Sequence, residues 1–480
     1  MSGKYEIVIG LEIHAELKTE RKMFCGCLNN PDEKEPNKNV CPVCLAYPGT
    51  LPAANKKAVE EIIKIGIALK GEILPTAIFS RKNYFYPDLP KGYQITSQPN
   101  PFVLGGFIEI GDRKIEIDHI HLEEDTGTLA HRKDYSLVDF NRAGVPLMEL
   151  VTKPCIESGF EARKFCEELQ LILQYLEVSE ANMEKGEMRC EVNISIREEG
   201  EKKFGTKVEI KNLNSFRAVE KSVEYEIERQ KKVLEEGKRV IQETRGWDEN
   251  KGETFSQREK EEAHDYRYFP EPDLPVFLTG DFELGRIKLG LPELPAGKRE
   301  RLRREYNLIE EQTEILVNDK KLANFFEAAA SELQVENTSV GYKTLYNYLV
   351  SDLIGLMNTK GVSFSELKIT PENFVDLVSM IESGKIGSRV AKNVLLRMFE
   401  TGADPKVVIV EEGLEQVSDE GRLRDVVLRV TGGNPNVVED YKVGKEAGLK
   451  FLIGQAMKET RGKGNPEVLK KMFEKEIKKS

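Results

Sequence analysis

Two patterns of apolar and polar positions, one typical of strands and one typical of helices, follow one another along the first 295 residues. Strict alternation is typical of β-strands, whose successive side chains point to opposite faces. It occurs at residues 6–17, 107–122, 137–151, 190–197 and 206–212. Apolar residues at helical spacing predict helices at residues 55–70, 160–176 and 216–235. We expect an α+β domain with a mainly antiparallel sheet.

The pattern becomes helical almost throughout after Leu291-Pro-Glu-Leu-Pro295. Thr370 and Pro371 are placed to begin a helix that Gly384 ends. A weaker boundary falls near Gly402-Ala-Asp-Pro405. We expect three domains: an α+β domain over residues 1–295, then an all-α region divided into residues 296–405 and 406–480.

Composition narrows the class of protein. The chain has 480 residues, of which 39% are hydrophobic and 32% charged, and a net charge of −11. It has no apolar run of the roughly 20 residues that span a bilayer and no signal-like start, which predicts a cytoplasmic protein. The negative net charge argues against a protein that binds nucleic acids in general.

The C-terminal segment departs from this acidic average. It is basic from Lys442 onward, which indicates a surface that could neutralise RNA phosphates. The candidate RNA-binding residues are Lys458, Arg461, Lys463, Lys470 and Lys471. The alternative is a solvated helix face with a frayed end.

Four of the seven cysteines cluster, as Cys25-Gly-Cys27 and Cys41-Pro-Val-Cys44. Two short spacings let each turn aim two sulfurs at one ion, which is typical of a tetrahedral zinc site. Gly26 frees the first turn, because sulfurs one residue apart would otherwise point oppositely on a strand. The alternative is four reduced thiols in a loop.

Carboxylates and imidazoles recur on the polar sides of the predicted strands. Glu12, His14 and Glu16 share one face of the first strand, and Glu149 is the only charge in an otherwise apolar strand. An isolated buried carboxylate is costly unless it is paired or bound to a cation. Oxygen ligands with little histidine favour Mg²⁺ over zinc. The alternative is an ordinary solvent-facing sheet surface.

No phosphate-binding loop accompanies this polar face. The chain lacks a Walker-type loop, a dinucleotide-binding glycine motif and a kinase catalytic loop. A nucleotide would therefore be held by side chains such as Lys82. The chain also lacks a serine–lysine amidase or cysteine glutaminase pattern, so ammonia for any nitrogen transfer would come from a partner.

Six sequence blocks together resemble those of the GatB family, the B subunits of aspartyl/glutamyl-tRNA(Asn/Gln) amidotransferases. They are Ile9-Gly-Leu-Glu-Ile-His14, Arg81-Lys-Asn-Tyr-Phe-Tyr-Pro-Asp88, His121-Leu-Glu-Glu-Asp-Thr-Gly127, Asp139-Phe-Asn-Arg-Ala-Gly-Val-Pro-Leu-Met-Glu149, Lys211-Asn-Leu-Asn-Ser215 and Asp265-Tyr-Arg-Tyr-Phe-Pro-Glu-Pro-Asp273. The blocks occur in order between Ile9 and Asp273, and the match runs over nearly the whole chain.

The resemblance implies a cradle domain over residues 1–295 that uses ATP and Mg²⁺. This domain would phosphorylate the side-chain carboxylate of Glu-tRNA(Gln) or Asp-tRNA(Asn). An amidase partner, the A subunit, would supply ammonia, and a small C subunit would tie the other two together. A helical domain over 296–405 and a YqeY-like tail over 406–480 would hold the tRNA. The cysteine loop, residues 24–45, follows the family's zinc-bearing version, which implies a structural ion.

Site residues follow from the resemblance position by position. The metal and catalytic residues implied are Glu12, His14, Glu124 and Glu149. Strand alternation instead favours Glu123 beside His121; we choose Glu124 on the resemblance. Position and charge suggest ATP or substrate contacts from Lys82, Asn141, Arg142, Arg189 and Lys211. Two rival hypotheses are a non-catalytic zinc scaffold that docks tRNA and a stand-alone metal hydrolase.

Overall fold

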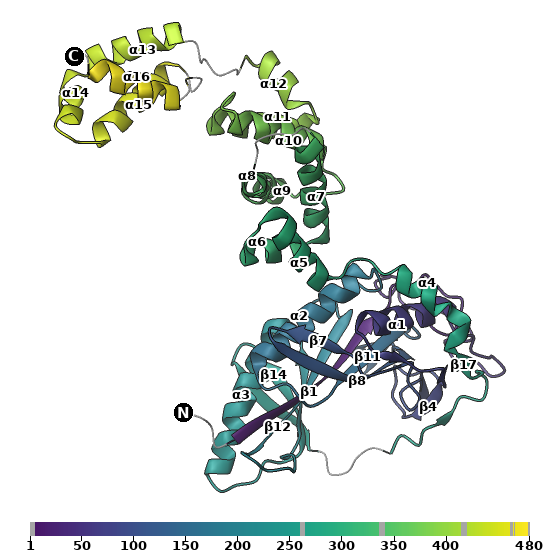
Figure 1. Cartoon of the computed structure of the whole chain (residues 1–480). Coiled ribbons are helices and arrows are strands. Elements are labelled where there is room, and N and C mark those ends of the chain that lie inside the picture. The colour runs from purple at the N-terminus through teal and green to yellow at the C-terminus, as the bar shows by residue number, and fades with distance from the viewer. Residues whose placement is uncertain are drawn as a thin grey trace. The chain divides into compact units, whose positions relative to one another are not determined.

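The computed structural model describes residues 5–259, 265–335, 341–413, 420–460, 464 and 466–478 (Figure 1). The chain divides into two compact units, Met1–Pro295 and Ala296–Ser480. Across these ranges, no helix is both long and apolar enough to cross a membrane.

One large sheet organises the first unit. Its centre consists of four long strands, β12 (Met188–Glu198), β1 (Tyr5–Glu16), β11 (Pro146–Thr152) and β8 (Arg113–Glu124), hydrogen-bonded in that order. These neighbours are all antiparallel, as alternation of apolar and polar residues led us to expect. The α+β class with a mainly antiparallel sheet is therefore confirmed.

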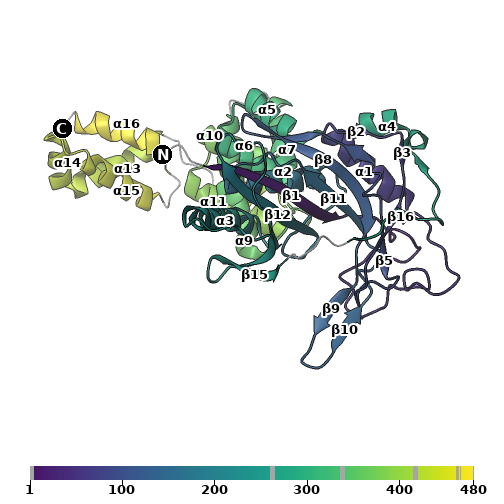
Figure 2. The same cartoon turned by 90° about the horizontal axis from the view of Figure 1, so that it is seen from below.

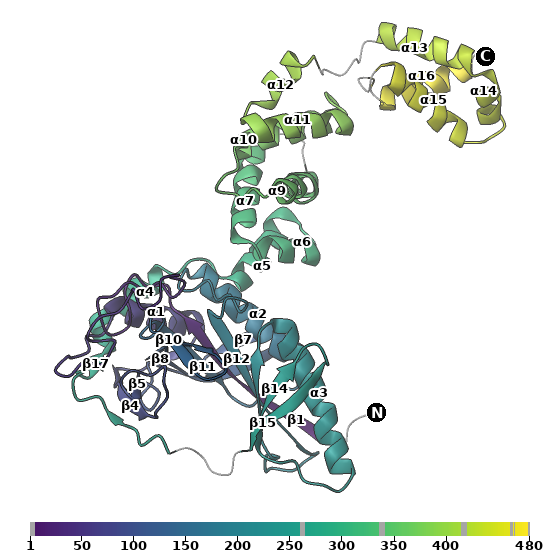
Figure 3. The same cartoon turned by 180° about the vertical axis from the view of Figure 1, so that it is seen from behind.

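Shorter strands extend the sheet at both ends (Figure 3). Beyond β12 lie β13 (Val208–Leu213), β14 (Glu243–Asp248) and β15 (Glu253–Glu259), and β13 and β14 are parallel. Beyond β8 lie β5 (Tyr93–Thr96), β4 (Ser80–Asn83) and β16 (Phe269–Pro270), while β2 (Glu72–Ile73), β6 (Val103–Leu104) and β7 (Phe107–Ile110) complete this side.

Two strand pairs lie outside the large sheet. The hairpin of β9 (Thr128–His131) and β10 (Ser136–Asp139) extends away from it (Figure 2). The other pair is β3 (Thr76–Ala77) with β17 (Phe277–Leu278), which is followed by the 3₁₀ turn Thr279–Phe282 and α4 (Leu284–Leu289).

Three helices pack against one face of the sheet (Figure 1). They are α1 (Lys56–Ala68), α2 (Gly159–Tyr175) and α3 (Phe216–Glu235). Asn55, Ser158 and Ser215 cap their first turns by accepting backbone N–H bonds. The apolar side of β1 contributes buried Ile9, Leu11 and Ile13 to this core. The polar side of β1 consequently lies on the other face.

Two predicted strands are each divided in the structure. Residues 107–122 form β7 and part of β8, separated by a turn in which Gly111 has a φ of +59°. Residues 137–151 form β10 and β11, separated by a turn that uses Gly144 at φ +87°. The positive φ angles, which favour glycine, are the physical reason for each break. The consecutive polar residues 112–114 and 141–142 interrupt the strict alternation at these turns, a signal that the prediction of single strands overlooked.

The second unit is helical. Its first helices are α5 (Pro295–Tyr306), α6 (Glu310–Val317), α7 (Lys320–Val335), α8 (Tyr342–Asn347), a π-helical segment (Tyr348–Leu353) and α9 (Ile354–Lys360). There follow α10 (Pro371–Glu382), α11 (Ser388–Thr401), α12 (Pro405–Glu411), α13 (Glu420–Gly433), α14 (Pro435–Lys442), α15 (Ala447–Glu459) and α16 (Pro466–Ile477).

The helix ends in this unit follow the sequence signals. Thr370 caps α10 by accepting the N–H of Asn373, and Gly402 ends α11 in the left-handed region. Helices α13, α15 and α16 bury Leu423, Leu452 and Phe473 in a common core. A separate domain starting at residue 406 stays a prediction.

Candidate active site

Strand register brings four polar residues into one row across the polar face of the sheet. His14 of β1 lies opposite Arg189 of β12 on one side and Glu149 of β11 on the other. Glu149 in turn lies opposite His121 of β8. Directly paired residues point to the same face, so residues far apart in the chain meet in a single line.

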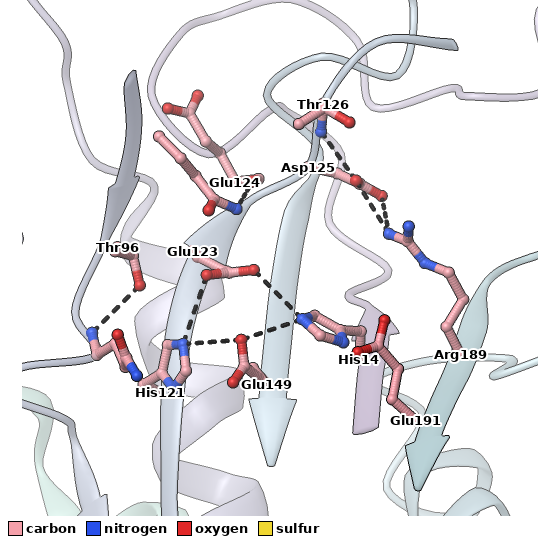
Figure 4. A network of polar contacts seen from close by, with 12 residues as sticks. His14, Thr96, His121, Glu123, Glu124, Asp125, Thr126, Glu149, Arg189 and Glu191 are labelled. Atoms are coloured by element: carbon pink, nitrogen blue, oxygen red, sulfur yellow. Dashed lines mark hydrogen bonds and ion pairs between the residues drawn. The ribbon is translucent and has the colours of Figure 1, made fainter. Parts of the chain in front are cut away.

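The two imidazoles contact two carboxylates in this row (Figure 4). His14 Nε2 lies 3.0 Å from Glu149 Oε2 and 3.6 Å from Glu123 Oε1. His121 Nε2 lies 3.3 Å from Glu149 Oε2 and 3.4 Å from Glu123 Oε2. The exposed fractions of Glu149, Glu123 and His121 are 5%, 2% and 0%, so this charge is almost wholly withdrawn from water.

Glu12 completes what we call the carboxylate–imidazole cluster: Glu12, His14, His121, Glu123 and Glu149. Ligand atoms of Glu12, His14 and Glu149 lie within 4.8 Å of one another, as do those of His121, Glu123 and Glu149. Glu149 belongs to both groups and can bridge them. The donor set of three carboxylates and two imidazoles matches what a divalent cation requires.

Burial and mutual repulsion disturb the titration of this cluster. Burial raises the pKa of Glu12 to about 7, and the neighbouring Glu149 and Glu191 add to the effect. Burial alone would lower the pKa of His121, but Glu149 and Glu123 outweigh it and raise that pKa to about 9. Positive charge is therefore favoured between the carboxylates, which a divalent cation can supply in place of imidazole protons.

The orphaned atoms of the cluster provide a second test of fit to a cation. Glu123 Oε2 and both ring nitrogens of His121 are buried without a hydrogen-bond partner in the described part of the chain. His121 Nε2 lies at ion-pair distance from Glu123 Oε2 and Glu149 Oε2, but the hydrogen-bond geometry is not met. Such buried polar atoms are costly unless a further group binds them, and a metal ion would do so.

Glu124 does not join the cluster. Its side chain points away from Glu123, as the pleat of a strand requires (Figure 4). Glu124 Oε1 lies 2.7 Å from Lys91 Nζ and also accepts the backbone N–H of Ile95. The geometry therefore favours Glu123 over our choice of Glu124 as a ligand of the same ion as His14 and Glu149.

Lys82 of β4 carries a positive charge toward the cluster. Burial would lower its pKa, but Glu123 and other negatively polarised neighbours raise that pKa above the usual value. The ammonium lies 5.1 Å from the ring centroid of Tyr266. Tyr266 also contacts Tyr84 and Tyr268 edge to face. These tyrosines were expected only as parts of family blocks, without a role.

Asp125 joins the two predicted arginines beside the cluster. Arg142 Nε lies 2.7 Å from Asp125 Oδ2, and its Nη2 lies 2.7 Å from Glu16 Oε1. Arg189 Nη2 lies 3.0 Å from both Asp125 oxygens (Figure 4). The half-buried Arg142 links Asp125 to Glu16, whereas the Arg189 side chain is 48% exposed and better placed to meet an anion. Asp125 was not among the predicted site residues, although a carboxylate directly after a polar strand was an available signal.

The last two predicted substrate contacts are otherwise engaged. Lys211 Nζ lies 2.6 Å from Glu191 Oε2. Glu191 lies opposite Glu12, on the row of paired residues next to that of His14. Asn141 is buried and bonds the cysteine loop: its Oδ1 accepts the N–H of Asn39, and its Nδ2 donates to the carbonyl of Glu35. Asn141 therefore positions the loop and does not reach the cluster through these bonds.

The four clustered cysteines converge as their spacing predicted. The sulfurs of Cys25, Cys27, Cys41 and Cys44 all lie within 4.8 Å of one another and can hold a metal ion. Donation from the Cys25 thiol lowers the pKa of Cys44 to about 5. A thiolate is the form that coordinates zinc, so the donor set fits a tetrahedral thiolate site.

The basic residues of the C-terminal segment are only partly described. Lys458 lies on α15 and Lys470 and Lys471 on α16, and all three are exposed. Arg461 and Lys463 lie outside the described residues. An RNA contact at these positions stays a prediction.

Fold and site together point to a class of catalytic domain, which comparison with known proteins identifies. Residues 7–282 match the model of the GatB/GatE catalytic domain, and residues 324–477 match that of the GatB domain. The first match contains the whole carboxylate–imidazole cluster.

Full-length relatives specify the family further. The B subunit of the aspartyl/glutamyl-tRNA(Asn/Gln) amidotransferase of Persephonella marina is 48% identical, over 99% of this chain and 100% of that protein. The proteins of the same name from Caldanaerobacter subterraneus (48%, 99% and 100%) and Carboxydothermus hydrogenoformans (46%, 98% and 98%) are similarly close. The chain belongs to this family of amidotransferase B subunits, and the resemblance seen in its sequence blocks is confirmed.

Proposed function

We propose that this chain is the carboxylate-activating subunit of a tRNA-dependent amidotransferase. It would use ATP to phosphorylate the side-chain carboxylate of Glu-tRNA(Gln), Asp-tRNA(Asn) or both. The observation that supports this proposal most strongly is the row of His14, Glu149 and His121, completed by Glu12 and Glu123 on the polar face of the sheet. The names of the full-length relatives supply the substrate class.

The proposed reaction follows from the poor leaving ability of a carboxylate oxygen. The side-chain carboxylate attacks the γ-phosphorus of ATP, the bond to the bridging oxygen breaks, and ADP leaves. Ammonia then attacks the carbonyl carbon of the acyl phosphate, and inorganic phosphate leaves with the bonding electrons. The products are the amide-bearing tRNA, ADP and inorganic phosphate, which takes up the proton that the attacking ammonia loses.

The cluster would hold Mg²⁺ through Glu12, His14, His121, Glu123 and Glu149. Bound there, Mg²⁺ would supply charge neutralisation at the transferring phosphoryl group. Lys82 would place a second positive charge beside that group, since it lies among tyrosines and faces Glu123. Arg189, held by Asp125, would orient an anionic oxygen of the substrate.

Partners would complete the reaction. Ammonia would come from an amidase, the A subunit of the complex, because the sequence shows no glutaminase nucleophile of its own. A small C subunit would join the two in a cytoplasmic heterotrimer. The exposed Lys458, Lys470 and Lys471, with Arg461 and Lys463, would contact the tRNA backbone.

The cysteine cluster would hold a structural Zn²⁺. Four thiolates leave no open coordination position, which is typical of a structural rather than a catalytic ion. The loop is also bonded to the segment before β11 through Asn141. We therefore propose that zinc stiffens the loop beside the catalytic sheet.

The decisive test is ATP cleavage by this chain assembled with its amidase partner and the small third subunit. We expect cleavage to require Mg²⁺ and a misacylated tRNA and Glu149→Gln to abolish it. Glu61→Gln is a matched control, since Glu61 is also a buried glutamate but lies on α1. Cleavage without tRNA or partners would favour a hydrolase. Full activity in Glu149→Gln would favour a scaffold.

A further inference from the structure

Lys22 is a completely buried cation without an acidic partner in the described part of the chain. Its exposed fraction is 0%, and it is among the largest fully buried side chains. Its ammonium donates to the carbonyl oxygen of Phe140 over 3.1 Å, and none of the described carboxylates lies at ion-pair distance from it. A buried charge is costly unless an opposite charge compensates it, so this lysine calls for an anion.

The cysteine cluster lies directly beside Lys22. The backbone N–H of Lys22 donates to the carbonyl of Cys27 over 3.0 Å, so the lysine is part of the turn that carries the first cysteine pair. Its side chain then passes Gly144, where a Cβ would lie 3.5 Å from Lys22 Cδ and 3.9 Å from Cys44 Cβ. Lys22 therefore contacts the surroundings of both cysteine pairs.

The charge of Lys22 acts on these sulfurs. Donation from the Cys25 thiol is the largest cause of the low pKa of Cys44, and the Lys22 ammonium acts on that pKa in the same direction. Cys44 Sγ also accepts the backbone N–H of Cys41 over 3.1 Å. These interactions stabilise a thiolate, which is the form of cysteine that binds a metal ion.

A metal ion bound by four thiolates would itself need a positive neighbour. Four thiolates outweigh the double positive charge of a zinc ion and leave a dianion. Cys44 is buried and Cys25, Cys27 and Cys41 are half-buried, so water screens this dianion only in part. A cation held in a fixed position beside it compensates part of the charge.

Two other cations near the cluster are less suited to this task. Arg21 precedes Lys22 in the chain, but its side chain is 50% exposed and contacts Glu20, so solvent and a carboxylate weaken its field. Lys91 lines a hollow beside the cluster, but its Nζ lies 2.7 Å from Glu124 Oε1. Of these three cations, Lys22 is the one that is both fully buried and without a carboxylate.

We propose that Lys22 is the counter-charge of the zinc–thiolate site and raises the affinity of the cysteine cluster for its metal ion. The inference rests on the structural zinc of the proposed function and adds to it a residue outside the four ligands. The bond to Phe140 holds the ammonium in place, and the ammonium balances part of the negative charge of the four thiolates. The metal-loaded cluster in turn compensates the buried lysine, so that each stabilises the other.

Three variants separate this charge effect from packing. Lys22→Met removes the charge and keeps a side chain of similar length; the bond to Phe140 is lost equally in the zinc-loaded and the zinc-free protein. Cys27→His replaces a half-buried thiolate by a neutral imidazole, which also binds zinc and makes the site less negative. Lys298→Met is the matched control, because Lys298 is 5% exposed but lies in the second unit, paired with Glu327.

The experiment titrates the full-length chain with Co²⁺, whose absorption reports thiolate coordination, and then displaces it with zinc in competition with a chelator. We expect Lys22→Met to weaken binding of both ions about 10- to 100-fold, as for residues that support metal ligands, and Lys298→Met to leave it unchanged. Cys27→His should weaken binding less in the Lys22→Met background than in wild type, because the two changes offset each other in charge. The thermal unfolding midpoint of Lys22→Met should fall further with zinc than without it.

Each contrary outcome overturns a definite statement. A wild-type chain that binds neither ion would overturn the zinc assignment itself. Wild-type affinity in Lys22→Met, a midpoint lowered equally with and without zinc, or strictly additive losses in the double variant would reduce Lys22 to core packing and overturn the counter-charge. If Lys22→Met does not fold, the double variant decides: recovery of folded, zinc-binding protein supports the proposal, and failure to recover overturns it. Carboxylate activation is tested separately, by ATP cleavage in the assembled complex.

Discussion

The carboxylate of Glu123 on β8 lies 3.6 Å from Nε2 of His14 on β1, across the whole width of the intervening strand β11. The neighbouring Glu124 turns the other way and pairs with Lys91. Two adjacent glutamates thus serve different partners, and only one of them faces the second imidazole, His121.

This difference predicts contrasting effects on metal binding. Glu123→Gln should weaken Mn²⁺ binding, used as a spectroscopic substitute for Mg²⁺, by about 10- to 100-fold, because it removes a charged ligand from a buried site. Glu124→Gln should leave Mn²⁺ affinity within about twofold, because that side chain is committed to Lys91 and Ile95. Electron paramagnetic resonance titration measures both. The reverse ranking would restore Glu124 as the ligand.

The cysteine cluster predicts that the purified chain carries one zinc ion per molecule by elemental analysis. Cys41→Ser should lower zinc content and the thermal unfolding midpoint, because the loop would lose a thiolate ligand. Cys155→Ser is the matched control, since Cys155 lies outside the four-sulfur group. Zinc-free protein with four titratable thiols in the loop and an unchanged midpoint would contradict the assignment.

The burial of Glu61 predicts that replacing its carboxyl by a neutral amide stabilises the folded protein, by an amount that depends on pH. Burial raises its folded-state pKa from 4.5 to about 7, so the folded state holds more protons than the unfolded state between these values. Stability falls as pH rises through this window. Glu61→Gln should match wild type below pH 4.5 and exceed it by about 3 kcal/mol above pH 7.

Urea unfolding at several pH values tests this prediction. The adjacent Glu60→Gln serves as the control, because it changes the same charge on the same helix at a more exposed position. A pH-independent difference between Glu61→Gln and wild type would show that the carboxyl of Glu61 titrates with the same pKa in the folded and unfolded states.

The basic C-terminal segment predicts a salt-sensitive contribution to tRNA binding. Replacing Lys458, Lys470 and Lys471 together with glutamine should reduce the slope of log affinity against log salt by about two to three, if each lysine neutralises one phosphate. The triple replacement of Lys360, Lys385 and Lys392 is a charge-matched control on other helices and connections of the second unit. An unchanged slope would remove these lysines from the interface.

Local signals in the chain predicted much of the structure. Alternation placed Glu12, His14 and Glu16 on one face of β1, because the period of a strand is two residues wherever it runs. The same period favoured Glu123 beside His121, and the structure places both in the cluster. Cap residues such as Thr370 and Gly402 marked helix ends through bonds to nearby backbone.

Side-chain contacts between strands of the sheet could not be predicted without the tertiary structure. The pairing of Asp125 with Arg142 and Arg189 was not predicted, since such contacts depend on how the turn before β11 returns toward the end of β8. The position of Lys22 beside Cys44 was equally hidden, because it exists only where the turn before β11 meets the cysteine loop at Gly144. The sequence by itself determined which residue types share a strand face and which cysteines can converge, because those properties are set over a few residues. Only the tertiary structure decided strand order and register, and through them which buried charges meet.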